Sequence, residues 1–185
     1  MEQEVTSILE IGVKGGGSTA LWKAIFPSAT VVGLDIKLRR WLKPQPSADG
    51  VIYIEGDQTD EELLRDAARR YGPFDLVLDD GAHIPDHQAT SMRCLLPHVR
   101  PGGFYVVEDI QTPVKGPSAG RTVEYGADIW ADFIAALFAE FRRAPIASTT
   151  AGARLAIEIV RRVDDLIVAK NVLAVRARGR STAPD

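Results

Sequence analysis

The chain has 185 residues, 45% of them hydrophobic and 25% charged, with a formal net charge of −3 at pH 7. This composition supports one sizeable core and excludes a collagen-like or generally disordered chain. Charges interrupt the apolar runs well before about 18 residues and the start MEQEVTS is polar, which predicts neither a transmembrane helix nor a signal peptide. We expect one cytoplasmic domain over residues 1–185, with no membrane partner and no nucleic-acid partner.

Short apolar runs alternate with longer amphipathic segments along the first two thirds of the chain. Strands are expected at 7–12, 29–35, 50–57, 74–80 and 103–110, with helices at 18–26, 60–72 and 86–99. Runs rich in Val, Ile and Leu are typical of buried parallel strands, and right-handed crossovers place helices on both faces of such a sheet. Ligands of these sheets bind beyond the carboxyl ends of the strands.

Acidic residues stand at the end of each of these five predicted strands. They are Glu10, Asp35, Asp57, Asp79 with Asp80, and Glu108 with Asp109. Any one carboxylate can simply cap the following helix. Five in a row along one edge of a sheet are costly unless a cation or a polar ligand meets them, so this edge is predicted to be a site.

The pattern changes after the fifth strand. Residues 110–126, rich in Gly, Pro and polar side chains, are expected to form either a functional loop over the strand ends or a plain connection. A helix is predicted at 127–143, and its helical spacing places six side chains in the core: Ile129, Trp130, Phe133, Leu137, Phe138 and Phe141. Over 154–177, two β-rich runs on either side of Val163–Asp165 predict an antiparallel hairpin at the edge of the sheet.

The segment EIGVKGGGS at 10–18 lies between the first predicted strand and helix. Its small residues allow backbone to approach a ligand closely, but Lys14 breaks the dinucleotide fingerprint and disfavours NAD. Glu10 is suited to an ammonium group, and Asp35 can accept hydrogen bonds from two ribose hydroxyls. For the glycines and for each polar residue, a turn or a cap is the alternative.

These residues resemble class I S-adenosylmethionine-dependent methyltransferases. The resemblance implies that Glu10 and the Gly12–Gly17 loop hold the methionine portion, Asp35 the ribose, and the GDQ motif at 56–58 the adenine edge. It also implies a Rossmann-like α/β doubly wound sheet, mostly parallel, with a C-terminal antiparallel hairpin and strand order 3-2-1-4-5-7-6. The complete predicted cofactor set is Glu10, Gly12, Gly16, Ser18, Asp35, Asp57, Gln58 and Asp79.

Three carboxylates are expected to meet where the fourth and fifth strands end, because neighbouring strands are about 5 Å apart. Asp80, Glu108 and Asp109 offer oxygen donors that suit Mg²⁺, and a bound metal would lower the pKa of a substrate hydroxyl. His83, three residues after Asp80, is placed to remove that proton as a general base. Helix capping by the aspartates and a purely structural turn histidine are the alternatives, and zinc is disfavoured because no cysteine or further histidine completes a set with His87.

A narrower resemblance rests on ILEIGVKGGGS, GDQTD, GPFDLVLDDGAHIPDHQ and RPGGFYVVEDIQT. These motifs are similar to the magnesium-dependent macrolide deoxysugar O-methyltransferases of mycinamicin and tylosin tailoring. The resemblance implies magnesium at Asp80, Glu108 and Asp109 and a catalytic base at His83. The chain departs from that group in two respects: it begins about seven residues before its first predicted strand, and PVKGPSAGR after EDIQT lacks the aromatic residues of the group. We therefore expect either a less covered cofactor pocket or one completed by a partner subunit.

The predicted function is transfer of a methyl group from S-adenosylmethionine to a hydroxyl of a small, sugar-bearing natural product, in antibiotic biosynthesis, with Mg²⁺ as second cofactor. Two alternatives stay open. An aminosugar N-methyltransferase needs no metal, because a neutral amine is already nucleophilic, and a non-catalytic adenosine-ligand-binding module would bind cofactor without turnover. The sequence leaves the acceptor and homo-oligomerisation undetermined.

Overall fold

The computed structural model describes residues 4–43, 50–110, 128–142, 144 and 150–179. The strands are β1 (Ser7–Ile11), β2 (Thr30–Asp35), β3 (Ile52–Glu55), β4 (Phe74–Asp79), β5 (Val99–Val107), β6 (Val163–Val168) and β7 (Leu173–Ala177). The helices are α1 (Gly17–Ile25), α2 (Glu61–Tyr71), α3 (Pro85–Leu95), α4 (Asp128–Phe141) and α5 (Ala151–Ile159). Short 3₁₀ turns are η1 (Arg40–Leu42), η2 (Leu96–His98) and η3 (Val160–Arg162). The predicted loop at 110–126 lies outside the described residues, except for Ile110.

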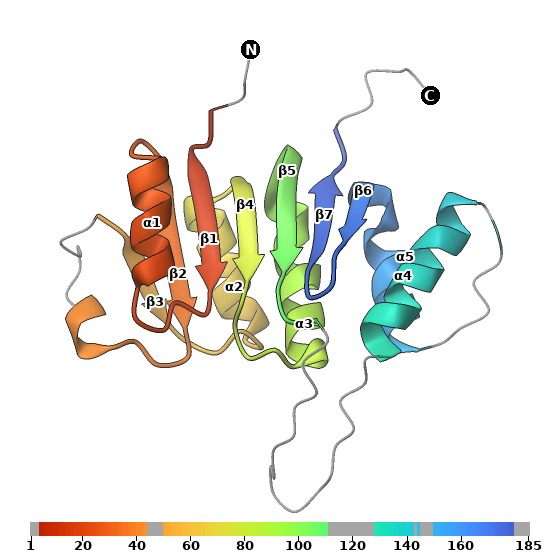
Figure 1. The fold of residues 1–185 in the computed structure, drawn as a ribbon, viewed down its shortest axis with the longest axis horizontal. Coiled ribbons are helices and arrows are strands. Elements are labelled where there is room, and N and C mark those ends of the chain that lie inside the picture. The colour runs from red at the N-terminus through yellow and green to blue at the C-terminus, as the bar shows by residue number, and fades with distance from the viewer. Residues whose placement is uncertain (1–3, 44–49, 111–127, 143, 145–149, 180–185) are drawn as a thin grey trace, which may run out of the picture.

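The strands form one seven-stranded sheet in the order β3-β2-β1-β4-β5-β7-β6 (Figure 1). Pairing is parallel from β3 to β5 and antiparallel between β5 and β7 and between β7 and β6. The predicted fold class and strand order are therefore confirmed. That residues 1–185 form a single domain stays a prediction.

Two hydrophobic clusters lie on opposite faces of this sheet. Val31 and Val32 are successive residues of β2 whose side chains point to opposite faces, and they belong to different clusters. The smaller cluster includes Trp22 and Phe26, from α1 and the residue after it. The larger cluster is built by the other four helices and includes Leu64, Met92, Phe133 and Ile159. The helices thus cover both faces, and the loops at the strand ends are left for ligands.

Local sequence signals explain where two of these helices begin. The Asp60 carboxylate caps α2 by accepting hydrogen bonds from the backbone N–H groups of Glu62 and Leu63, both at 3.1 Å. Helix α3 begins at Pro85, whose missing N–H is not needed in the first turn. None of the helices in the described ranges is long and apolar enough to cross a membrane.

The antiparallel hairpin predicted at the edge of the sheet is present, but its first strand was predicted in the wrong place. The run before Val163 is not a strand: Leu155, Ala156 and Ile159 are buried at helical spacing in α5, and Thr150 caps this helix by accepting from the Ala153 N–H at 3.3 Å. The antiparallel hairpin consists of β6 and β7 alone.

The aromatic face of α4 is also smaller than predicted. Trp130, Phe133 and Leu137 are buried as expected, whereas Phe138 is 57% and Phe141 42% exposed. A helix that packs on one side buries only one stripe of its surface, and these two side chains lie outside that stripe.

Candidate functional site

The carboxyl ends of four parallel strands meet at one edge of the sheet. Ile11 at the end of β1 is in register with Leu34 of β2 and Asp79 of β4, and Asp79 pairs with Val107 of β5. Backbone hydrogen bonds continue one step past these strands, from Gly12 N to Leu34 O at 2.8 Å and from Asp80 N to Ile11 O at 3.0 Å. The edge predicted to be a site is therefore a continuous rim.

The first loop of the rim requires glycine at two positions. Gly12 has φ +90°, and a Cβ on it would lie 2.2 Å from the Asp80 carbonyl oxygen. Gly16 has φ +83° as the residue before α1, and a Cβ there would lie 2.9 Å from Leu42 Cδ2. At both positions the backbone has a positive φ, which residues with a Cβ seldom adopt, and it lies too close to another segment for a side chain to fit. The loop from β1 thus touches the loop from β4 directly.

Glu10 lies beneath this loop and is only 1% exposed. Its carboxylate accepts hydrogen bonds from the Ser18 hydroxyl and from Trp22 Nε1, the latter at 2.8 Å. Burial raises the pKa of Glu10, and the hydrogen bonds from Ser18 and Trp22 oppose that rise. The structure places Glu10 and Ser18 together at the start of α1, and their contact with a ligand ammonium stays a prediction.

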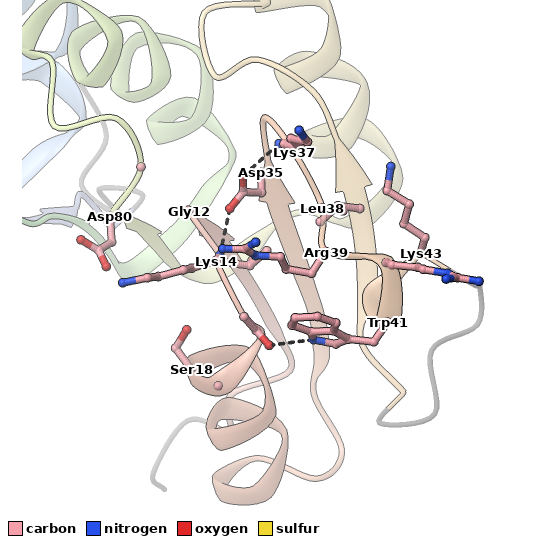
Figure 2. Close-up of a pocket in the computed structure, with 15 residues that line it drawn as sticks. Gly12, Lys14, Ser18, Asp35, Lys37, Leu38, Arg39, Trp41, Lys43 and Asp80 are labelled. Carbon is pink, nitrogen blue, oxygen red and sulfur yellow. Dashed lines mark hydrogen bonds between the residues drawn. The ribbon is translucent and has the colours of Figure 1, made fainter.

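Two cavities adjoin at Asp35. The larger has a volume of about 1090 Å³ and is lined by the glycine loop, the segment after β2, and Asp80 with Gly81 (Figure 2). The smaller, of about 310 Å³, is lined mostly by apolar side chains, among them Ile11, Leu34 and Ile84. Gly12, Asp35 and Gly81 belong to both linings. One elongated ligand can therefore occupy both cavities, with a flat apolar end in the smaller one.

Asp35 stands where the two cavities join. Its carboxylate accepts hydrogen bonds from the backbone N–H groups of Lys14 at 2.8 Å and Lys37 at 3.0 Å. These bonds fix the side chain at the mouth of the smaller cavity, and the carboxylate, which has two acceptor oxygens, retains acceptor capacity for ligand hydroxyls. Asp57 also lines the smaller cavity, and its carboxylate accepts from the Thr59 N–H at 2.8 Å.

Gln58 and Asp79 form a buried hydrogen-bonded pair under the rim. Gln58 Nε2 donates to both Asp79 carboxylate oxygens, at 3.1 and 3.2 Å, and Gln58 Oε1 accepts from the Ala82 N–H at 2.7 Å. Asp79 is completely buried, and burial raises its pKa to about 6. Both residues were predicted to bind cofactor. The structure places Asp79 inside the protein and Gln58 in the wall of the smaller cavity. The Gln58 side-chain amide is already hydrogen-bonded to Ala82, in the turn before His83.

Three side chains of the predicted chemical end lie together. Asp80, His83 and Asp109 each offer a ligand atom within 4.8 Å of the others. His83 Nδ1 is 3.9 Å from Asp80 Oδ1, and His83 Nε2 is 3.7 Å from Asp109 Oδ2. His83 and Asp109 have φ values of +55° and +53°, a region that non-glycine residues seldom adopt. Strained backbone of this kind gathers at functional sites, and here it turns both side chains to one point.

Glu108 lies beside this cluster and is not a member of it. Burial raises the pKa of Glu108, and the negative charges of Asp80 and Asp109 raise it further. The pKa of Asp80 is also raised, first by burial, while His83 opposes the rise. Carboxyl groups that raise each other's pKa are stabilised by a cation.

A divalent cation fits this donor set. His83 Nδ1 is buried without a hydrogen-bond partner among the described residues, and an ion or ligand bound by the cluster would satisfy it. Carboxylate oxygens suit Mg²⁺, whereas an imidazole nitrogen is a softer donor. The structure thus brings together two of the three predicted metal ligands with the predicted base, and the division of these roles stays a prediction.

Two residues that the sequence interpretation missed hold the β5 end of the rim. Gln88 of α3 is fully buried; its Nε2 donates to the Glu108 carbonyl at 2.9 Å, and its Oε1 accepts from Trp130 Nε1 at 3.2 Å. The Asn171 carbonyl, in the turn between β6 and β7, accepts from the Ile110 N–H at 3.2 Å. A glutamine on the apolar stripe of the predicted helix was the signal that could have identified Gln88.

The chain is similar to a known protein family and to several known proteins. A family model described as a methyltransferase domain matches residues 9–110. Mycinamicin VI 2''-O-methyltransferase from Micromonospora griseorubida is 49% identical over 112 residues, covering 57% of this chain and 27% of its own length. Demethylmacrocin O-methyltransferase from Streptomyces fradiae is 44% identical over 116 residues, covering 59% of this chain and 28% of its own length.

The fold is also similar to a solved structure. The MycE methyltransferase of the mycinamycin biosynthetic pathway, in complex with Mg and SAH, superposes with a TM-score of 0.72 at 35% identity. The similarity covers 95% of this chain and 45% of the MycE chain. The chain therefore spans less than half the length of these three proteins.

Proposed function

The chain belongs to the methyltransferase-domain family that matches residues 9–110, and from this premise we propose that it moves a methyl group from S-adenosylmethionine to a hydroxyl of a small, sugar-bearing natural product, with Mg²⁺ as second cofactor. The names of the two relatives described above, both O-methyltransferases, support the reaction type. SAH and Mg in the MycE complex support the cofactor pair.

The two cavities support a divided cofactor site. The smaller, largely apolar cavity suits an adenine ring, with Asp57 and the Gln58 side chain in its wall. Asp35 would accept hydrogen bonds from the ribose hydroxyls at the point where the two cavities meet. Gly12 and Ser18 line the larger cavity together with Asp35 and would border the methionine portion, with Glu10 beneath them. Gly16 is not in this lining and would contribute by shaping the turn before α1.

The carboxylates at the ends of β4 and β5 would hold the metal. Asp80, Glu108 and Asp109 supply oxygen donors, and their mutual repulsion gives them a reason to bind a cation. Mg²⁺, when bound, supplies Lewis acidity that lowers the pKa of an acceptor hydroxyl. Asp80 would orient that hydroxyl toward the larger cavity, because Asp80 also lines that cavity.

His83 removes the hydroxyl proton. The neutral imidazole would accept the proton on one ring nitrogen; Nδ1 lies 3.9 Å from Asp80 and Nε2 lies 3.7 Å from Asp109. The oxygen would then attack the methyl carbon of the cofactor in line with the C–S bond, so that an O–C bond forms as the C–S bond breaks and SAH leaves as a neutral thioether. The side chains contribute mainly by positioning the reactants and excluding water.

One observation carries this proposal: the Asp80–His83–Asp109 cluster adjoins the ligand-sized cavities, because Asp80 belongs to both the cluster and the lining of the larger cavity. An aminosugar N-methyltransferase would use the same cavities without the metal. A non-catalytic adenosine-ligand-binding module would use them without the cluster.

The decisive experiment measures cofactor and metal binding separately. Calorimetry with SAH, once with Mg²⁺ and once with chelator, is expected to give binding in both conditions. Electron paramagnetic resonance with Mn²⁺ in place of Mg²⁺ is expected to report a bound ion in the wild type, and Asp80→Asn and Glu108→Gln should each lose it while keeping their SAH affinity. Glu62→Gln, on the exposed surface of α2, is the matched control and should change neither.

Absence of SAH binding would overturn the proposed function. SAH binding without any Mn²⁺ signal would favour the N-methyltransferase alternative. Loss of SAH binding in Asp80→Asn would mean that the carboxylate cluster serves the cofactor instead of a metal.

A further inference from the structure

The larger cavity carries a positive charge that the proposed reaction leaves unexplained. Five cationic residues line it against two carboxylates, Asp35 and Asp80; the cations are Lys14, Lys37, Arg39, Arg40 and Lys43. The whole chain has the opposite sign, with a net charge of −3. Positive charge is therefore concentrated in this cavity.

The cofactor does not account for this concentration. S-adenosylmethionine carries two positive charges, on its sulfonium and ammonium groups, and one carboxylate, so a strongly cationic wall opposes its binding. One lysine, Lys14, and the N-terminus of α1 are sufficient to bind the carboxylate of the cofactor. The Lys14 side chain points toward Asp80 (Figure 2), whereas Lys37 and Arg39 belong to the segment after β2.

The segment after β2 is anchored, so its cations are held at the cavity. Leu38 and Leu42 are 7% and 5% exposed and belong to the smaller hydrophobic cluster. The Leu38 N–H also donates to the Glu55 carboxylate at 2.8 Å. Two buried leucines four residues apart leave the side chains between and beside them at the cavity, which reduces the entropy lost when they bind a ligand.

Most of these cations have no acidic partner within the described parts of the chain. Lys43 pairs with Glu55 at 2.8 Å, but Lys37, Arg39 and Arg40 make no ion pair there. Arginine presents a fork of N–H donors that matches phosphate oxygens, and two arginines with a lysine suit a diphosphate better than a single carboxylate.

An exposed aromatic ring accompanies the cations. Trp41 is 67% exposed and lines the same cavity, with its Nε1 donating to the Gly15 carbonyl at 3.4 Å. This bond steadies the indole over the glycine loop (Figure 2). An indole face beside phosphate-binding cations is a stacking surface for a nucleobase.

We propose that Lys37, Arg39, Arg40 and Trp41 form a subsite for a nucleoside diphosphate, and that the methyl acceptor is a sugar attached to it. This inference rests on the proposed methyl transfer to a sugar hydroxyl, and it replaces the sugar-bearing natural product as acceptor by the sugar before its attachment. The same cavity includes Asp80, so the diphosphate at one wall and the sugar hydroxyl at the other belong to one molecule. The sugar is then methylated before a glycosyl transfer step attaches it to its final carrier. A nucleic-acid polymer is disfavoured because the cations face one cavity instead of following a stripe.

Calorimetry on the SAH-saturated full chain tests the subsite with two probes, inorganic pyrophosphate and uridine diphosphate. Both should bind, and uridine diphosphate should bind more tightly. Arg39→Gln should weaken both probes about tenfold. Trp41→Ala should weaken uridine diphosphate about tenfold and leave pyrophosphate unchanged. Arg69→Gln, an exposed arginine of α2 outside the cavity, is the matched control and should change neither probe.

Retained SAH affinity in each variant shows that its cofactor pocket is intact. The inference is overturned if neither probe binds, if Arg39→Gln leaves both affinities unchanged, or if the probes displace SAH, since displacement would assign the cations to the cofactor carboxylate. A chain that fails to bind SAH would overturn the proposed function, and titration of both probes without SAH would then still report on the subsite separately.

Discussion

His83 combines a rare backbone conformation with a ring nitrogen that has no hydrogen-bond partner in the described parts of the chain. Its φ of +55° is tolerated by asparagine, so His83→Asn keeps the turn and removes the base. We expect methyl transfer to a sugar acceptor to slow by about 100-fold or more, with SAH and Mn²⁺ binding unchanged. Single-turnover rates with radiolabelled S-adenosylmethionine measure this, and a rate equal to that of the wild type would remove His83 as the base.

The buried carboxyl of Asp79 makes the stability of the protein depend on pH. Burial in the folded protein raises the pKa of the Asp79 carboxyl from its ordinary value of 3.8 to about 6, because burial penalises the charged form. The stability gained from the proton on this carboxyl is complete below pH 3.8 and is lost as the pH rises through 6.

Lowering the pH from 7 to 5 should therefore stabilise the wild type by about 1 kcal/mol relative to Asp79→Asn. Urea unfolding of both proteins at the two pH values measures the difference, and the titrations that the two proteins share cancel. Equal pH dependence of the two free energies of unfolding would contradict the prediction.

At the level of elements, α4 and α5 depend on a single glycine for their close approach. A Cβ on Gly152 would lie 2.0 Å from the Ile129 carbonyl oxygen, so Gly152→Ala forces the helices apart. We expect a loss of about 1–3 kcal/mol in the free energy of unfolding, measured by thermal or urea denaturation.

Gly17→Ala is the matched control, because Gly17 also stands in the first turn of a helix and nothing lies within 4 Å of its added Cβ. This variant should be neutral or slightly stabilised. Equal stabilities for the two variants would show that the α4–α5 contact adapts freely.

The elements at the start of the chain could be predicted because local pattern and tertiary role agree there. Apolar runs such as SILEI and TVVGLD are buried on both faces, as parallel strands require. Helix α5 could not be predicted in the same way: RLAIEIV is rich in β-branched residues, and the helix results from packing against α4 and α3, which no local pattern contains.

The same contrast applies to the candidate site. The acidic strand ends identify Asp35, Asp80 and Asp109, because parallel topology carries every strand end to one edge. The hydrogen bonds of Gln58 to the Asp79 carboxylate and of Gln88 to the Glu108 backbone carbonyl join residues 21 and 20 positions apart in the sequence. Sequence reasoning had no means to pair such residues.

At the scale of the whole molecule, the residues proposed to bind cofactor come from the ends of β1, β2, β3 and β4. A ligand held by four strands stabilises the fold by mass action, by about 2.7 kcal/mol at a concentration of 100 times its dissociation constant. For a chain of this size we expect SAH to raise Tm by roughly 5–10 °C, equally with Mg²⁺ and with chelator. Differential scanning calorimetry measures this shift, and a shift that disappears in chelator would mean that the metal shapes the cofactor pocket.

The edge where the strands end lies apart from the core that holds the sheet together, and this separation has an evolutionary consequence. Substitutions in Lys37, Arg39 or Trp41 change what the cavity accepts without removing a buried apolar side chain. Selection can then act on acceptor choice while stability stays nearly constant. Gly12 is the exception, because its close contact with the Asp80 carbonyl matters both for the shape of the cavity and for the stability of the fold. Descendants of this sequence should therefore diverge fastest along the segment after β2 and slowest at Gly12.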